Sequence, residues 1–244
     1  AASDVYKRQF SNREDALKLD GMLKIGEQLD PGFIEQHPEL RSRRNVTALE
    51  GTELAGIDID QAGIFYPTAG HFNPRRVCQS LLSASNITWC GNTTINAIEP
   101  SNGLWQARTL QGETLQAKTL IIAAGDQTRG FEQTNWIPLK TIRGQTSRIE
   151  QRNIVTAFSS LRRAICGKGY VSPPNDEGVN LGATFTLRDN TAICNQHDHE
   201  LNLRNLLALF SPRSTQHQLI AKLLDDKQSI SELVGRVGFR AVSP

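Results

Sequence analysis

Several features are scarce in this sequence, and each scarcity excludes a class of protein. Lys and Arg number 27 against 25 Asp and Glu, so the formal net charge of the 244 residues is only +2. This balance argues against a strongly basic nucleic-acid binder or a membrane-surface protein. The longest aliphatic run, Leu120–Ala124, is too short to cross a bilayer. We therefore predict a chain that does not associate with membranes.

Cysteines are few and lack the spacing of a metal or redox motif. The four, Cys78, Cys90, Cys166 and Cys194, contain no C-x-x-C pair. A chain of this length needs no disulfide staples, so we predict a reduced, cytoplasmic protein. The stretch Cys194 to His199 comes closest to a zinc pattern, but no fourth ligand is placed nearby. We predict no metal site and interpret this stretch as a polar helix start.

Familiar phosphate and nucleophile motifs are also missing. The sequence has no Walker A motif, no G-x-S-x-G and no G-x-G-x-x-G, and so lacks the phosphate cradle of a dinucleotide fold. The first residue is Ala, and the opening stretch has no apolar period. We expect residues 1–11 to be a non-native or disordered lead and the chain to be a fragment truncated at both ends. The alternative is a natural short chain with frayed ends.

What is present indicates mixed α and β structure. Hydrophobic residues make up 38% of the chain, enough for a sizeable core. Apolar residues alternate with charges over 12–29, which we interpret as a helical face. Asn73 followed by Pro74 indicates a helix start, and the apolar spacing around 203–210 and 219–224 predicts two amphipathic helices. The predicted strands are 63–66, 93–99, 104–110, 118–125, 138–150, 169–171 and 179–185.

The run from Lys118 to Gly125 is the most informative of these strands. It is continuously apolar and ends in Ala-Ala-Gly, which predicts a central strand covered on both faces. Small residues at its end would let a nucleotide approach the backbone. A plain core strand ending in a turn explains the same residues. Together with the hairpins, this pattern predicts two interleaved domains of mixed α/β type.

Six stretches, taken in order, resemble the D-amino-acid-oxidase-like family of FAD-dependent amine oxidases. They are GIFYPTAGHFNP, TLIIAAGD, PLKTIRGQTSRI, CGKGYVSPP, VNLGATF and GRVGFRAVSP, and the resemblance covers roughly residues 12–244. Within the family, the IFYP, RGQ-x-S and G-x-R stretches favour the flavin domain of bifunctional tRNA-modifying enzymes over a glycine or sarcosine oxidase. The family's opening G-x-G-x-x-G strand and a methyltransferase half do not occur in this chain.

The resemblance implies a partial FAD-binding, Rossmann-like domain interleaved with an antiparallel-sheet substrate domain. It implies the following boundaries: a helical cap segment over 12–62, the partial FAD-binding domain over 63–138, the substrate domain over 139–232, and a return to the FAD-binding domain over 233–244.

The resemblance also implies the chemistry. Members pass a hydride from the carbon beside an amine nitrogen to flavin N5, and the cofactor is FAD. Arg240 matches the arginine that fixes the substrate carboxylate, a task suited to its planar fork. Tyr170 matches a substrate-pocket tyrosine. A surface arginine and a half-buried strand tyrosine are the simpler explanations of these two residues.

Seven further residues match positions that contact the cofactor in the family. Thr94 and Ile95 would meet the adenine, Ala124 and Gly125 would lie at the nucleotide edge, and Gly144, Gln145 and Gly238 would lie near the flavin.

The implied substrate is a carboxymethylaminomethyl group on the tRNA wobble uridine, from which oxidation would leave aminomethyl and release glyoxylate. A tRNA partner needs basic surface, and the candidates are Arg41, Arg43, Arg44, Arg162, Arg163 and Lys168. One alternative is oxidation of a free, glycine-like amine such as glycine or sarcosine. The other is a non-catalytic, incomplete flavin fold.

Overall fold

The computed structural model describes residues 17–18, 20–36 and 42–243, which form two compact units. The larger contains the described residues up to Ser80, with Gln145–Thr184 and Ala192–Val237. The smaller contains Leu81–Gly144, Phe185–Thr191 and the residues from Gly238. Each unit is therefore assembled from segments far apart in sequence, and the predicted mixed, interleaved α/β class is confirmed. The expected lead at 1–11 and Arg41 lie outside the described residues.

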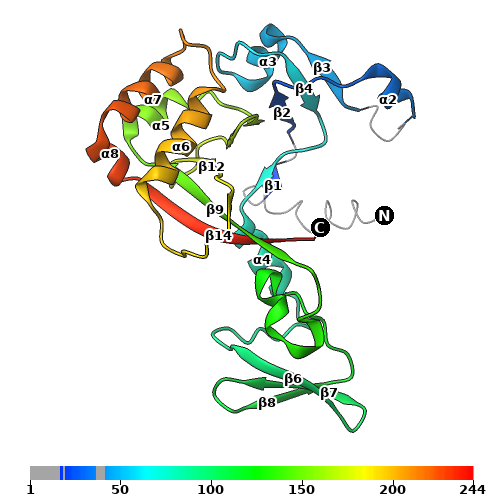
Figure 1. The fold of residues 1–244 in the computed structure, drawn as a ribbon. Coiled ribbons are helices and arrows are strands. Elements are labelled where there is room, and N and C mark those ends of the chain that lie inside the picture. The colour runs from blue at the N-terminus through cyan, green and yellow to red at the C-terminus, as the bar shows by residue number, and fades with distance from the viewer. Residues whose placement is uncertain (1–16, 19, 37–41, 244) are drawn as a thin grey trace. The chain divides into compact units, whose positions relative to one another are not determined.

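A mixed sheet forms the centre of the larger unit (Figure 1). Its strands run in the order β12-β11-β10-β2-β4-β3, and the pair β10–β2 is parallel whereas its other pairs are antiparallel. Beyond β12 the order continues through β9 (Lys140–Ile149) to β13 (Thr186–Leu187), and β14 (Val234–Val242) also pairs with β9. The remaining bounds are β2 Met22–Ile25, β3 Arg44–Val46, β4 Gly63–Tyr66, β10 Ala164–Cys166, β11 Tyr170–Val171 and β12 Val179–Gly182.

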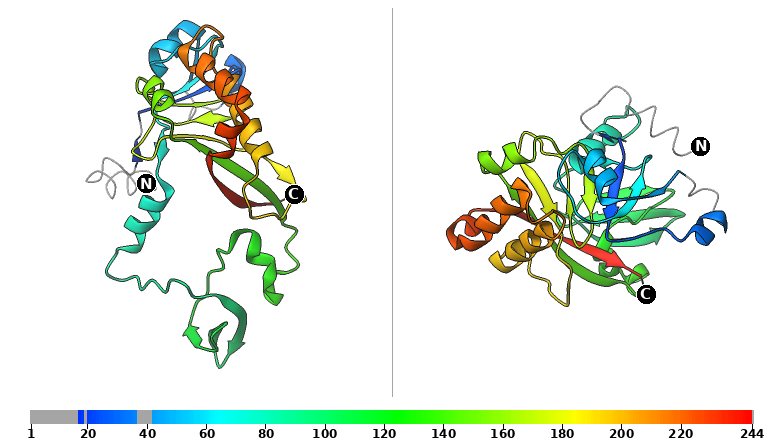
Figure 2. Two further views of the ribbon diagram at one scale, coloured as in Figure 1. Left: turned by 90° about the vertical axis from the view of Figure 1, so that its left-hand side faces the viewer. Right: turned by 90° about the horizontal axis from the view of Figure 1, so that it is seen from above.

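Helices from the second half of the chain pack against one another beside this sheet (Figure 2). They are α5 (Arg152–Ala157), α6 (Gln196–Leu207), α7 (Thr215–Asp225) and α8 (Lys227–Ser231). Leu203 and Leu206 of α6 and Ile220 and Leu223 of α7 are buried, which confirms the two predicted amphipathic helices. The other helices are α2 (Pro31–Gln36), α3 (Ala48–Ala55) and α4 (Pro74–Leu82).

The predicted start of α4 is also confirmed. Asn73 precedes the helix, and its side-chain oxygen accepts a hydrogen bond from the Arg76 amide at 3.2 Å. Pro74 occupies the first helical position, where a missing N–H costs nothing. Strand β5 (His71–Phe72) lies just before this helix in the chain and pairs with β1 (Leu17–Lys18). Within the described part, no helix is long and apolar enough to cross a membrane.

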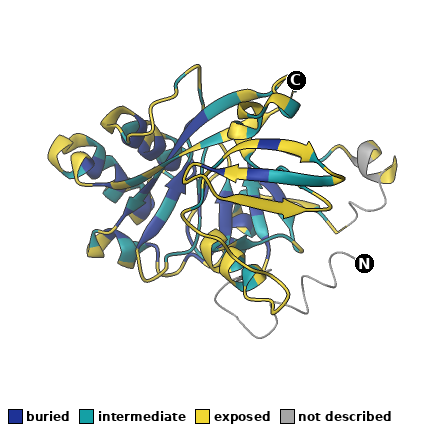
Figure 3. Cartoon of the chain, turned by 90° about the horizontal axis from the view of Figure 1, so that it is seen from below, coloured by how far each residue is buried: buried dark blue, intermediate teal, exposed yellow. Residues whose placement is uncertain are grey.

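The hydrophobic core lies in the larger unit, as the dark blue strands and helices of Figure 3 show. Leu23, Ile165 and Leu181 come from the sheet and pack with the apolar faces of α6 and α7. The rings of Phe158 and Phe210 meet edge to face at 5.5 Å between centroids. Burial of this apolar surface is the main favourable term in folding this unit.

The helix expected over 12–29 is wrong for the described residues of that range, 17–18 and 20–29. Residues 22–25 form β2, in which Leu23 and Ile25 are buried while Met22 and Lys24 are half-buried. This alternation has a period of two, as a strand requires, rather than the 3.6 of a helix. The adjacent strands β4 and β10 supply backbone partners on both sides. β4 itself belongs to the larger unit, whereas the sequence placed it with the hairpins.

The smaller unit holds a three-stranded antiparallel meander of β6 (Ile95–Ser101), β7 (Leu104–Thr109) and β8 (Thr114–Ala117). The predicted hairpins are thus confirmed. The first turn has Asn102 at φ 51° and Gly103 at φ 74°, two successive left-handed residues that suit a tight hairpin. Two short 3₁₀ helices follow, η2 (Gly125–Gly130) and η3 (Glu132–Thr134).

The central strand expected over 118–125 is also wrong. Residues 119–124 form no strand, and Ile121 is 84% exposed. A strand needs the backbone of a neighbouring strand for its hydrogen bonds, and none of the described strands pairs with this run. The apolar sequence of this run is typical of a buried strand, but no described strand lies beside it to accept and donate the backbone hydrogen bonds.

Candidate functional site

A stripe of buried polar side chains runs along β9. Arg143, Gln145 and Ser147 are 0%, 0% and 1% exposed. They alternate along one strand, so their side chains share one face. Buried polar groups are costly unless they are hydrogen-bonded, and each of the three has such partners.

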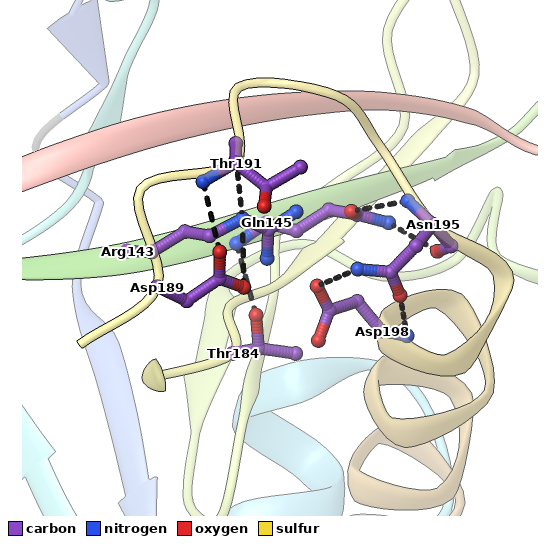
Figure 4. A network of polar contacts seen from close by, with 7 residues as sticks. All are labelled: Arg143, Gln145, Thr184, Asp189, Thr191, Asn195 and Asp198. Atoms are coloured by element: carbon purple, nitrogen blue, oxygen red, sulfur yellow. Dashed lines mark hydrogen bonds and ion pairs between the residues drawn. The ribbon is translucent and has the colours of Figure 1, made fainter. Parts of the chain in front are cut away.

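The Gln145 side chain is hydrogen-bonded to the backbone at the start of α6 (Figure 4). Its side-chain amide donates to the Asn195 carbonyl and accepts from the Asn195 amide, both at 2.9 Å. Asn195 is the N-cap of α6 and accepts from the amide of Asp198 at 2.8 Å. The backbone of Gln145 also pairs with Thr184, whose hydroxyl accepts from the Gln145 amide at 3.0 Å. The Gln145 side chain therefore positions the helix that follows the 184–195 segment.

Ser147 contacts a buried histidine on the same helix. Its Oγ lies 2.7 Å from Nδ1 of His199 and accepts from Nδ2 of Asn202 at 3.0 Å. Burial lowers the pKa of His199 below its ordinary value of 6.5, although the neighbouring carboxylate of Asp198 acts in the opposite direction. The His199 ring and the Ser147 hydroxyl share this hydrogen bond at Nδ1, and the tautomer of the ring sets which of them donates. The predicted polar helix start around Cys194 is thus the first turn of α6, and His199 is one of its anchors.

Arg143 lies at the beginning of the stripe, in the smaller unit. Its Nε donates to the Thr191 carbonyl at 2.7 Å and lies 3.6 Å from a carboxylate oxygen of Asp189. The Thr191 amide in turn donates to Asp189 at 2.8 Å. This hydrogen bond, joined by the charge of Arg143, lowers the pKa of Asp189. The buried guanidinium thus closes the loop after β13 onto β9.

The proposed substrate arginine occupies β14. Arg240 is exposed, and its guanidinium carbon lies 4.1 Å from the ring centroid of Phe185, within cation–π range. No carboxylate of the described residues forms an ion pair with it. Gly238 precedes it on the same face of the strand, and a Cβ built there meets no atom within 4 Å. The Arg240 guanidinium is thus restrained by the Phe185 ring, and the space above the neighbouring Gly238 is open.

The other predicted site residues divide between the units. Tyr170 begins β11 in the larger unit and is half-buried opposite Gly182. Thr94 is exposed and its carbonyl accepts from Leu110 at 2.9 Å, while Ile95 begins β6. The remaining three are Ala124 before η2, Gly125 at φ +59° with open space around it, and Gly144, which is buried in β9.

Sequence reasoning missed Arg143, Ser147 and His199 as anchors. A signal existed for the first two, because R-x-Q-x-S alternates polar residues within an otherwise strand-like stretch. His199 gave no such signal, since its partner lies 52 residues away in the sequence. Among the described residues, no three His, Cys, Asp or Glu side chains cluster as metal ligands would.

The comparison with protein families places this chain in a class of flavin-dependent oxidoreductases. The profile of the DAO family, described as FAD dependent oxidoreductase, matches residues 9–243. The chain therefore belongs to this family, and the resemblance described above is confirmed.

Its relatives are large bifunctional proteins. Over 192 residues the chain is 33% identical to the tRNA 5-methylaminomethyl-2-thiouridine biosynthesis bifunctional protein MnmC of Stutzerimonas stutzeri (strain A1501), covering 78% of this chain and 28% of the relative. The protein of the same name from Chromobacterium violaceum is 33% identical over 195 residues, or 79% and 28% of the two chains. The chain thus spans about 28% of the length of these relatives.

Solved structures share the fold at lower identity. Glycine oxidase from Geobacillus kaustophilus superposes with a TM-score of 0.68 at 13% identity, covering 99% of this chain and 65% of that one. Iminodiacetate oxidase (IdaA) from Chelativorans sp. BNC1 gives 0.60 at 18% identity, with 98% and 65% covered. These likenesses establish the architecture that carries the site.

Proposed function

We propose that this chain is the FAD-holding part of an amine oxidoreductase that converts the carboxymethylaminomethyl group of tRNA wobble uridine to aminomethyl. The observation that carries the proposal is the 33% identity to two tRNA-biosynthesis proteins. Arg240 supports it, because a held guanidinium beside open space suits the terminal carboxylate of such a group.

The residues present fit FAD. The proposed cofactor positions Gly125 and Gly238 have open space where a side chain would otherwise stand. Gly125 also has a left-handed backbone at φ +59° that favours glycine. The adjoining run over 120–124 is apolar and belongs to no strand. Such a surface suits a flat, partly apolar ring system and a nucleotide. Thr94, Ile95, Ala124, Gly144 and Gln145 complete the proposed cofactor contacts.

Bound FAD would supply the hydride acceptor for the carbon beside the amine nitrogen, and water would hydrolyse the resulting imine to glyoxylate and the aminomethyl product. The task of the protein is positioning. Arg240 pairs with the carboxylate through two parallel hydrogen bonds, and the ring of Phe185 limits the movement of the guanidinium. Tyr170 remains a proposed substrate contact on the larger unit.

The test uses the full chain loaded with FAD. We would incubate it with tRNA bearing carboxymethylaminomethyluridine and, separately, with glycine, sarcosine and iminodiacetate. Glyoxylate and the modified nucleoside are measured by mass spectrometry. The proposal expects conversion of the tRNA and little turnover of the free acids. Turnover of the free acids without tRNA conversion would instead identify a small-amine oxidase.

A further inference from the structure

A hollow of roughly 450 Å³ opens in the larger unit, away from the polar stripe of β9. The side chains that matter to its chemistry are Asp20, His71, Ser159, Arg162 and Arg163. They come from the chain before β2, from β5 and from the loop between α5 and β10. Ser159 and Arg162 are exposed, so a large ligand can reach them.

The two arginines are held at the end of α3. This helix is capped by Gly56, whose φ of +80° is left-handed, and its last carbonyls have no helical partners. The Arg162 amide donates to the Ala55 carbonyl at 2.8 Å, and its guanidinium donates to the Glu53 carbonyl. The Arg163 guanidinium donates to the Leu54 carbonyl. A cation at a helix C-terminus is also favoured by the helix dipole.

A second contact fixes Arg163 more closely. Its Nε donates to the Asp20 carbonyl at 2.6 Å, and its guanidinium carbon lies 5.8 Å from the centroid of the Phe65 ring. Both guanidiniums are therefore oriented before any ligand arrives, which lowers the ordering cost of binding.

The groups that hold the two guanidiniums are uncharged. The acceptors named above are backbone carbonyls, and no carboxylate of the described residues forms an ion pair with Arg162 or Arg163. Asp20 is the acidic side chain in the lining, so two arginines against one aspartate leave a net charge of +1. Each guanidinium has five N–H donors, of which hydrogen bonds to the described residues use one at Arg162 and two at Arg163. The spare donors suit an anionic oxygen pair.

We propose that this hollow binds a backbone phosphate of the tRNA substrate. The inference rests on the proposed function, which supplies the RNA. A phosphodiester carries one negative charge, which balances the net charge of +1 in the hollow. Its two free oxygens can accept hydrogen bonds from the spare N–H donors of the two guanidiniums. The hollow is thus a positioning site for RNA, distinct from the proposed carboxylate contact at Arg240.

The experiment measures binding of fluorescein-labelled tRNA to the full chain by anisotropy over a salt series. Ser159→Asp places a carboxylate beside the arginines and leaves their contacts to α3 intact, because the Ser159 side chain makes no hydrogen bond to the described residues. Arg162→Gln removes one cation. The matched controls are Gln196→Glu, which adds the same charge at the exposed start of α6, and Arg213→Gln, which removes an exposed arginine elsewhere in this unit.

We expect Ser159→Asp and Arg162→Gln each to weaken tRNA binding by roughly tenfold or more. Arg162→Gln should also reduce the slope of log affinity against log salt by about one. The controls should bind like the wild type. If both hollow variants bind like the controls, this proposal is overturned while the proposed function stands. If the wild-type chain binds no tRNA, both are overturned.

Discussion

The surroundings of Arg240 suit the carboxylate contact proposed for it. Its guanidinium rests on the Phe185 ring at 4.1 Å and faces no carboxylate of the described chain. Cation–π contact restrains the fork without neutralising it. The charge therefore remains available to an incoming carboxylate.

Arg240→Lys should mainly raise the KM for the carboxylate-bearing amine. Lysine keeps the charge but loses the paired hydrogen bonds, a loss on the order of 1.5–3 kcal/mol, or roughly tenfold to a hundredfold. Steady-state kinetics of the FAD-loaded chain measure it. Arg236→Lys, at another exposed arginine of β14, is the matched control. Unchanged KM in Arg240→Lys would refute the assignment.

His199 should make folding stability depend on pH. Because burial lowers its pKa in the folded state, the unfolded chain binds more protons below about pH 6.5. Stability is therefore full above that pH and falls as the pH drops toward the folded-state pKa. Urea unfolding between pH 7.5 and 5.5, roughly spanning the ordinary pKa of histidine, should show this loss.

The variant His199→Gln should lose this part of the pH dependence. It should also be less stable at neutral pH by about 1–3 kcal/mol, because Ser147 loses its hydrogen bond to His199 and keeps only the one from Asn202. His217→Gln on α7 is the control, since that side chain makes no hydrogen bond to the described residues. An unchanged pH slope in His199→Gln would argue against a role for His199.

For individual residues, the sequence predicted part of the site. Gln145 was singled out, but as a flavin neighbour, and its side chain instead holds Asn195. Its approach to a flavin remains a prediction. Arg143 and Ser147 were not identified because a single strand does not reveal which face will be covered. That face is set by α6 and the 189–195 segment, which come roughly 50 residues later.

Among the elements, α3 is short but fixed at both ends. Thr47 and Glu50 form a reciprocal capping box at its start. At its end, Gly56 takes a left-handed conformation against the Ser160 carbonyl. A short helix is unstable in isolation, so these ends and the arginines after α5 determine whether it forms.

Gly56→Ala should destabilise the larger unit more than Gly26→Ala. Both glycines have similar backbones, at φ +80° and +77°, so each alanine costs about 1–2 kcal/mol in backbone strain. A Cβ at Gly56 would overlap the Ser160 carbonyl, whereas at Gly26 it meets the movable Gln61 side chain at 3.3 Å. We expect about 1–3 kcal/mol more for Gly56→Ala, measured by urea unfolding. Equal losses of unfolding free energy in the two variants would show that the loop containing Ser160 moves away from the added Cβ at little cost.

Elements with local signals were predictable, and those that depend on distant partners were not. The hairpin at Asn102–Gly103 and the caps of α4 and α6 are encoded within a few residues. β2 and the run over 119–124 are the contrast. The first becomes a strand because β4 and β10 lie beside it, and the second does not because no described strand does.

The two units of the molecule differ in how they are stabilised. The buried apolar cluster lies entirely in the larger unit among the described residues, whereas the buried apolar side chains of the smaller are Ile98 and Ala107. All three tryptophans lie in the smaller unit, and Trp89 and Trp136 are 69% and 75% exposed. Tryptophan fluorescence therefore reports on the smaller unit alone.

In urea, the fluorescence transition should precede the loss of far-ultraviolet circular dichroism. The dichroism signal comes chiefly from α5–α8 in the larger unit, whose core buries far more apolar surface. Both signals are recorded on the same samples. Superimposable transitions would mean that the chain unfolds as one cooperative body.

The polar stripe of β9 has a consequence for chain alignment during folding. Apolar side chains tolerate a slipped pairing if volume is preserved, but Arg143, Gln145 and Ser147 each require a different partner. A slip by two residues would leave an amide or a guanidinium buried and unpaired, and a slip by one would turn the stripe to the opposite face. Only one register of β9, the longest strand of the sheet, therefore gives all three side chains their hydrogen-bond partners.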